Sequence, residues 1–125
     1  MNKETLNARS KPIVAAGVNC DNEDLSGEDF VKANFTRGNF YCAKLVGTNF
    51  SSALLSKAHF FRADLTGANF TKAYLLGASL EQANLSGADF TNANLSGVDF
   101  TGADLTGACF KGANLANATG YKPAK

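Results

Sequence analysis

The sequence predicts an all-β solenoid, a single domain of about five square coils with four five-residue units in each coil. Three observations lead to this prediction. Every fifth residue from Leu25 to Leu115 is Leu or Phe, without a miss. These large residues fall into matching columns when positions twenty apart are compared. Glycine recurs two residues after the large positions, where a chain that closes a coil must turn.

The five-residue unit reads Ala, then Asn or Asp, then Leu or Phe, followed by two variable residues, as in residues 83–87. A period of five matches neither an α-helix nor a flat strand, whose side chains repeat about every 3.6 and every 2 residues. The unit therefore predicts a short extended piece followed by a corner. Ala and the large residue point into the coil, and the Asn or Asp between them points outward.

The twenty-residue period predicts four units in each coil. One column of large positions is all Leu, from Leu25 to Leu105, and the next is all Phe, from Phe30 to Phe110. Like residues then stack at the spacing of paired strands, about 4.8 Å, which gives a rod roughly 24 Å long. Stacked Phe rings at that spacing lie in the favourable offset range.

The corners follow from the glycines. Ten of the twelve glycines lie two residues after a large position or its extrapolation. This slot is the third residue of a β-turn, where type II geometry needs a positive φ. Where a residue with a side chain fills the slot, we expect a turn with negative φ. These corners include Lys32, Arg37, Ser52 and Lys57.

The repeat resembles that of the pentapeptide-repeat family over residues 18–119, about four-fifths of the chain. The resemblance is to bacterial members, and most of all to cyanobacterial ones. It implies a right-handed quadrilateral β-helix, in which the handedness comes from the resemblance and the square section from the twenty-residue period. We expect a cap over residues 1–17, the β-helix over 18–119 and a tail over 120–125.

Both ends of the rod need closing, because an open coil exposes strand edges and the apolar core. The composition of Asn2–Arg9, together with the resemblance, favours a helical N-terminal cap. At the other end Gly120 replaces the large residue and is expected to end the core. No amphipathic dimerisation helix follows Leu115, so we expect a monomer.

Two glutamates, Glu23 and Glu28, occupy inward small slots in the first coil. Buried carboxylates need partners. One candidate is the hydroxyl of Thr48, directly above Glu28 in its column. The cap offers three bases as further candidates: Lys3, Arg9 and Lys11. We expect a polar joint, open to water, between the cap and the first coil.

The sequence offers no catalytic, cofactor-binding or metal site, and we expect no enzyme activity. The single histidine, His59, occupies an outward slot. Outward Ser, Thr, Asn and Asp recur in most units, so we expect them to bond turns and neighbouring coils rather than form an active site. A core filled by Leu and Phe leaves no internal cavity for a substrate.

The cysteines and the apolar runs bear on the compartment. Cys20, Cys42 and Cys109 are too scattered to pair within a monomer. Free thiols fit a reducing compartment, so we expect a cytoplasmic protein. No apolar run is long enough for a transmembrane helix, so we expect no membrane insertion.

The predicted surface departs from the repeat in one region. Residues 31–72 hold six bases against one acid, and large apolar residues occupy outward slots between residues 41 and 76. Exposed apolar and aromatic side chains often mark interfaces. We call the following candidate interface residues the basic-aromatic band: Tyr41, Leu54, Phe61, Tyr74, Leu76, Arg37, Lys57, Arg62 and Lys72. The alternative interpretation is tolerated variation on a repeat surface.

Three functional hypotheses remain. The first, implied by the resemblance, is a scaffold or regulator that binds an unidentified protein partner through its faces. The second is topoisomerase protection by DNA mimicry, known for certain family members, which the net charge of +1 and the lack of a C-terminal dimerisation module disfavour. The third is binding of an acidic partner or nucleic acid by the basic-aromatic band, although a near-neutral chain is an unpromising general nucleic-acid binder.

Overall fold

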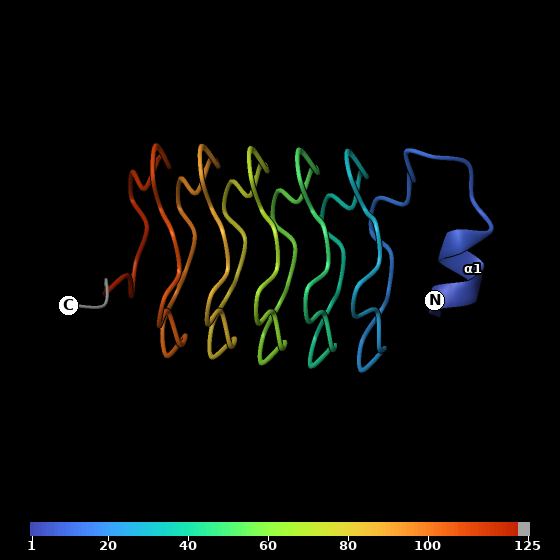
Figure 1. The fold of residues 1–125 in the computed structure, drawn as a ribbon, viewed down its shortest axis with the longest axis horizontal. Helices are drawn as coiled ribbons and strands as arrows, with labels where there is room; N and C mark the ends of the chain where they lie inside the picture. Colours follow the sequence, from blue (N-terminus) through green and yellow to red (C-terminus); the bar gives the residue numbers. More distant parts are fainter. Residues whose placement is uncertain (123–125) are drawn as a thin grey trace.

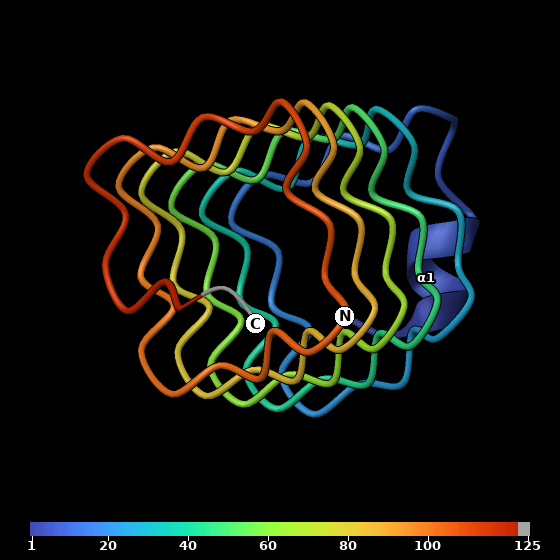
Figure 2. The same cartoon turned by 60° about the vertical axis from the view of Figure 1, so that its left-hand side comes forward.

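The computed structural model describes residues 1–122, which form a rod of stacked coils with one short helix at the N-terminal end (Figure 1). Parallel bridges run from Val14–Asn34 to Asp99–Thr119, and each joins residues twenty positions apart. This confirms the predicted coil of four units, and Figure 2 shows the coils stacked in register. The pairing begins at Val14, a few residues before the predicted start of the repeat.

Each coil has four faces, which we number in chain order from Asp24. Face 1 carries the outward column Asp24, Lys44, Asp64, Asn84 and Asp104. Face 2 carries Asp29, Asn49, Asn69, Asp89 and Cys109. Face 3 carries Asn34, Leu54, Tyr74, Asn94 and Asn114. Face 4 carries Asn39, His59, Ser79, Asp99 and Thr119.

Backbone hydrogen bonds tie each unit to the coil that follows it. The Phe70 N–H donates to the Asp89 carbonyl at 2.7 Å, and the Lys72 N–H donates to the Thr91 carbonyl at 2.9 Å. The side chain of Asp89 accepts the Thr91 N–H at 2.9 Å, and the same bond recurs at other corners, as between Asn84 and Ser86. The outward Asn and Asp side chains therefore bond their own corners, as the sequence predicts.

The core is the inside of the coil. The Phe rings of face 2 stack nearly parallel, with 5.2 Å between the centroids of Phe50 and Phe70 and 4.9 Å between those of Phe70 and Phe90. Phe60 meets Phe70 edge-on at 6.1 Å. The large inward residues from Leu25 to Phe100 are all buried. This confirms the inward and outward assignment of the repeat.

The first coil has one inward slot whose surroundings leave room only for glycine. Phe35 stands in a column that is otherwise Leu from Leu55 to Leu115. Gly38 occupies a small inward slot where most units have Ala. A Cβ at Gly38 would lie 2.9 Å from the Phe35 carbonyl oxygen and 2.9 Å from the ring of Phe40. The space beside these residues therefore admits only glycine.

The expectation of negative φ at corners with a side chain is wrong. Lys32, Arg37, Ser52 and Lys57 have φ angles of 58 to 61°, in the left-handed region that glycine favours. The cause is the bond to the next coil, since the N–H of this slot must reach a carbonyl there, as Arg37 reaches Ser56 at 2.8 Å. A turn of another type would break this bond and the register of the stack.

Helix α1 (Lys3–Asn7) closes the N-terminal end of the core and confirms the predicted helical cap. The side chain of Asn2 accepts the Thr5 N–H at 2.9 Å, which begins the helix. Leu6, one turn on, is fully buried against the first coil. The cap therefore covers the N-terminal end of the core with an apolar side chain.

The joint between the cap and the coil differs from the prediction in its partners. The amide of Asn7 donates to the carboxylate of half-buried Glu28 at 2.6 Å. Thr48, one of the four candidate partners, does not fill this role, because its buried hydroxyl donates to the Leu25 carbonyl at 2.9 Å. The side chains of Arg9 and Lys11 donate to backbone carbonyls, those of Val14 and Asp29 respectively.

Gly120 does not end the core, contrary to the prediction. Its φ of 67° is followed by Tyr121, whose ring lies over the last coil, 4.9 Å from the Phe110 centroid and 6.1 Å from that of Phe100. Tyr121 is half-buried and covers part of the C-terminal end. Residues 123–125 of the predicted tail lie outside the described residues.

Candidate interaction surface

The basic-aromatic band supplies several of the most exposed large apolar side chains. The exposed fractions are 45% for Tyr41, 43% for Leu54, 41% for Tyr74 and 39% for Leu76. Phe61 is half-buried. Each of these residues stands in an outward or corner slot that small polar residues fill in other coils, so the fold does not need the apolar side chain there.

The corner between face 4 and face 1 carries an aromatic stack. The rings of Tyr41 and Phe61, one coil apart, lie 5.0 Å apart with 26° between their planes. The Arg62 guanidinium carbon lies 5.7 Å from the Phe61 centroid, and the Arg62 Nε donates to the Gln82 Oε1 at 3.0 Å. The two stacked rings and the adjacent Arg62 guanidinium group form a continuous surface along this corner, which we call the aromatic ridge.

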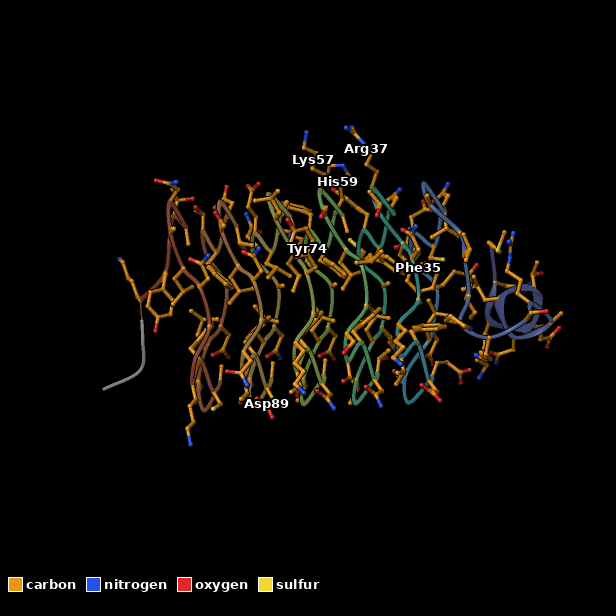
Figure 3. All side chains as sticks on the ribbon, turned by 90° about the horizontal axis from the view of Figure 1, so that it is seen from above. Phe35, Arg37, Lys57, His59, Tyr74 and Asp89 are labelled. Carbon is orange, nitrogen blue, oxygen red and sulfur yellow. The ribbon has the colours of Figure 1, made fainter. Side chains whose placement is uncertain are left out.

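Leu54 and Tyr74 form a second apolar group on face 3, where they are directly paired across coils. Leu76 lies at the corner that leads to face 4. Figure 3 shows Arg37 and Lys57 projecting from one edge of the rod, with His59 beside them. The band thus holds two apolar groups, and face 4 lies between them.

Between the two apolar groups, the outward column of face 4 holds smaller polar residues, which we call the floor of face 4. Asn39, His59 and Ser79 succeed one another in its outward column. The Asn39 amide donates to Asn19 Oδ1 at 3.2 Å, and the Ser79 hydroxyl donates to Glu81 Oε1 at 3.1 Å. Arg37 and Lys57 stand at one edge of this floor and the aromatic ridge at the other. Lys72 lies apart, at the corner between faces 2 and 3.

Besides the terminal Met1, sequence reasoning missed two exposed apolar residues. Val46 is 41% exposed at the corner between faces 1 and 2, and Val14 is 65% exposed beside the cap. Val46 occupies the same slot within its unit as Tyr41, Phe61 and Leu76, so a comparison of that slot alone would have found it. Neither residue lies next to the band.

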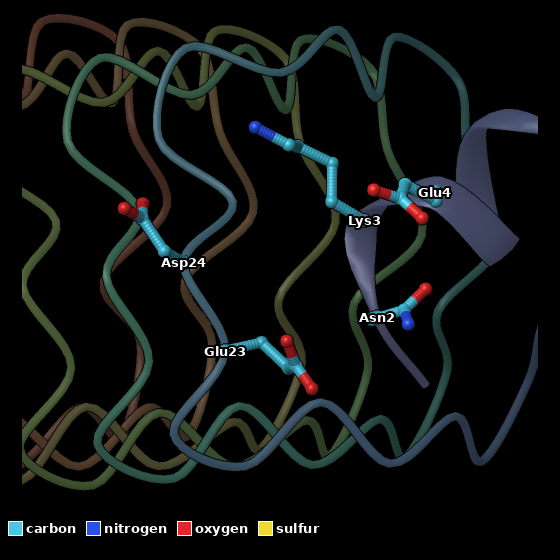
Figure 4. Close-up of a pocket in the computed structure, with 5 residues that line it drawn as sticks. All are labelled: Asn2, Lys3, Glu4, Glu23 and Asp24. Carbon is cyan, nitrogen blue, oxygen red and sulfur yellow. The ribbon is translucent and has the colours of Figure 1, made fainter.

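Two open hollows lie at the N-terminal end. One, of about 220 Å³, lies between the start of α1 and face 1 and is lined by Asn2, Lys3, Glu4, Glu23 and Asp24 (Figure 4). The other, of about 280 Å³, is lined by Arg9, Ser10, Pro12 and Val14. The first is the polar joint that Glu23 predicts, with acids from both the cap and the coil.

The chemistry-bearing side chains are dispersed over the rod. Within residues 1–122, no three His, Cys, Asp or Glu side chains gather in a metal-binding arrangement. Burial raises the pKa of the Cys20 thiol to about 11, whereas hydrogen bonding with the Thr91 hydroxyl lowers the pKa of exposed Cys109. All three thiols are free. No helix in the described part of the chain is long and apolar enough to cross a membrane.

A model of the family described as "Pentapeptide repeats (8 copies)" matches residues 16–51, 43–82 and 83–119. No curated protein matches the chain. Among solved structures, the pentapeptide repeat protein Rfr23 of the cyanobacterium Cyanothece 51142 is 29% identical. The match covers 86% of this chain and 87% of that one, with a TM-score of 0.82.

A pentapeptide repeat protein from the thylakoid lumen of Arabidopsis thaliana is 38% identical over 85% of this chain and 70% of that one, with a TM-score of 0.66. QnrB1, a plasmid-mediated fluoroquinolone resistance protein, is 20% identical over 85% and 72%, with a TM-score of 0.37, and so carries no weight for function. The neighbours with high TM-scores are right-handed quadrilateral β-helices.

Proposed function

The chain belongs to the pentapeptide-repeat family, and within that family we propose that it is a non-enzymatic interaction protein that binds a protein partner through the basic-aromatic band. The observation that carries the proposal is the exposure of Tyr41, Leu54 and Tyr74 in slots where the fold needs only small polar residues. Aromatic and Arg side chains carry much of the energy of protein interfaces. The proposal includes a monomeric state, and it includes a reducing compartment, which the three free thiols support.

The aromatic stack favours a protein partner over a single-stranded nucleic acid. Proteins that bind single strands present ring faces on which bases stack. Here the ring faces of Tyr41 and Phe61 are turned toward each other, and Arg62 lies over the Phe61 ring. Within the stack, only the face of Tyr41 that points away from Phe61 is left without a ring or guanidinium partner. This gives at most one stacking position for a base, whereas the ring edges suit contact with apolar side chains.

Topoisomerase protection by DNA mimicry is the weaker alternative. A DNA mimic must present extended negative potential, as a duplex does. The chain has a net charge of +1, and six bases lie within residues 31–72. A gyrase supercoiling assay with and without the inhibitor tests this alternative directly.

The proposal is tested by restoring the polar repeat in the band. Phe61→Ser and Tyr74→Asn remove one member of each apolar group, and Thr71→Ser is the control, since it changes the corner slot equivalent to Phe61 on another edge. Surface changes of this kind alter stability by less than about 1 kcal/mol. In pull-downs from lysate of the source cells, the wild type and the control should retain partners that the double variant loses. Unfolding of the double variant, or retention of the same partners, would contradict the proposal.

A further inference from the structure

Eleven non-glycine residues between positions 1 and 122 have a positive φ, and five of them are long basic residues. Lys32, Arg37, Lys57, Arg62 and Lys72 all occupy the third slot of a corner, with φ angles of 57 to 61°. A left-handed conformation costs a residue with a side chain about 1 kcal/mol. Glycine fills the same slot elsewhere, as Gly77 and Gly97 do in the column of Arg37 and Lys57.

The geometry of the corner therefore does not require the cations, because glycine adopts the same conformation without strain. Residues held in sparsely populated backbone regions often mark functional positions. The basic residues occupy this slot only in the first coils. The four consecutive corners from Gly97 to Gly112 have glycine in the same slot, and the corner after them has Asn117. The charge of these residues, rather than their conformation, is what distinguishes the first three coils.

Three of these five cations border face 4. Arg37 and Lys57 stand in one column at the corner between faces 3 and 4 (Figure 3). Arg62 stands at the opposite corner, beside the Tyr41–Phe61 stack. The three extended residues between the corners place the two edges about 10 Å apart. The floor between them is formed by Asn39 and His59.

The positive stretch of face 4 is short. Glu81 and Asp99 bound it toward the C-terminus, and Asp21 bounds it toward the N-terminus. The cations thus cover two or three coils, roughly 10–15 Å along the rod. This length matches about four residues of an extended peptide and is too short for the long phosphate track of a duplex.

We propose that face 4, between the Arg37–Lys57 edge and the Tyr41–Phe61–Arg62 edge, binds a short extended acidic segment of a protein partner. Carboxylates of the segment pair with the three cations, and an apolar side chain rests against the ring edges of Tyr41 and Phe61. This inference rests on the proposed function and adds the chemistry of the partner. Binding of this kind weakens as salt rises, since the cations are exposed.

The probe is a short fluorescein-labelled peptide of aspartates with one leucine and one phenylalanine. Its controls are the same peptide with asparagine in place of aspartate, and an oligothymidylate of equal length. Binding to the full chain is measured by fluorescence anisotropy at low and at physiological salt. We expect the acidic peptide to bind the wild type and the asparagine peptide to bind at least tenfold more weakly, because the latter loses about two charge contacts. The oligothymidylate carries similar charge, and we expect it to bind more weakly than the acidic peptide because the stacked rings offer its bases few free faces.

The decisive variant is Arg37→Gly with Lys57→Gly. Both changes place glycine at a backbone position with positive φ, so the midpoint of urea unfolding should rise or stay the same. The affinity for the acidic peptide should fall about tenfold. The matched control is Lys32→Gly with Lys44→Asn, which removes two charges elsewhere on the same coils and should change affinity less than about twofold. Equal affinity in the decisive variant and the wild type overturns the inference. So does failure of the acidic peptide to bind, or equal binding of the oligothymidylate.

The same variant separates this inference from the proposed function. If captured partners remain on Arg37→Gly/Lys57→Gly but are lost from Phe61→Ser/Tyr74→Asn, the acidic segment is wrong and the protein-binding band stands. If they remain on both variants, the proposed function fails as well.

Discussion

Gly38 shows how one residue can be fixed by the packing around it rather than by its own conformation. Most units have Ala in this slot, and the repeat taken alone would favour Ala here too. The carbonyl of Phe35 and the ring of Phe40 instead lie 2.9 Å from where a Cβ would stand, and a Val18 methyl group lies 3.3 Å away. A backbone carbonyl, an aromatic ring and a methyl group therefore close this slot together, and only a residue without a Cβ leaves room for all three.

We therefore expect Gly38→Ala to destabilise the protein by about 1–3 kcal/mol, the usual effect of overpacking. Urea unfolding of the single variant measures this loss. Phe40→Leu places in this coil the residue that Leu80 places in the same column two coils on. In the double variant part of the Gly38→Ala loss should be recovered, which a double-mutant cycle detects. A neutral or stabilising Gly38→Ala would show that the first coil has room to spare.

Among the elements, the corners show where reasoning from sequence reaches its limit. The large inward slots and the Asn or Asp that bonds each corner follow from periodicity, because burial alone decides them. The φ of Arg37 does not, because it is imposed by a hydrogen bond to Ser56 on the next coil, whatever residue fills the slot. Tyr121 escaped prediction for a related reason: its partner Phe110 lies across the coil end and not in its own unit.

The corners also predict a response to acid. Hydrogen bonds from Thr101 lower the pKa of Asp99, and those from Thr106 lower the pKa of Asp104. Because the folded pKa lies below the unfolded value of about 4, each group stabilises the fold above that pH and stops doing so as pH falls through the folded pKa.

The matched change is Asp99→Asn with Asp104→Asn, since Asn84 and Asn94 already make the same corner bond with a side chain that does not titrate. The double variant should lose less of its melting temperature than the wild type between neutral pH and about pH 3. Parallel losses in thermal melts followed by circular dichroism would mean that these two corners do not set the acid response.

At the scale of the whole molecule, stability comes from the stack. Phe70 is buried and lies between Phe50 and Phe90 at 5.2 and 4.9 Å. Phe110 lies in the same column but near the open end, where it is partly buried beneath Tyr121.

Phe70→Ala should cost about 3–5 kcal/mol, because neighbours on both sides are held by the ladder and cannot close the gap. Phe110→Ala should lower the free energy of unfolding by less, because Phe110 is only partly buried and Tyr121, rather than a further coil, covers its outer side in the described part of the chain. Urea melts of the two variants give the comparison. Equal losses would mean that the C-terminal coil is as rigid as the centre.

The candidate surface could be predicted in part at this scale. Its exposed residues follow from the repeat, since any large apolar residue in an outward slot must face water. Their grouping follows from the twenty-residue period, which places Tyr41 and Phe61 in one column and Leu54 and Tyr74 in another. The positive φ of Arg37 and Lys57 could not be predicted, because it depends on a bond to the next coil.

The pairing of residues twenty apart makes the coil a unit of length. Deleting or adding twenty consecutive residues within the repeat would leave each column of the core continuous and move the two ends of the rod by about 4.8 Å, without turning one face against another. A change of five residues would also keep the inward pattern, yet it would rotate everything beyond it by a quarter turn and set Leu columns on Phe columns. The distance between helix α1 and Tyr121 can therefore vary among related chains in steps of one coil while faces 3 and 4 keep their direction.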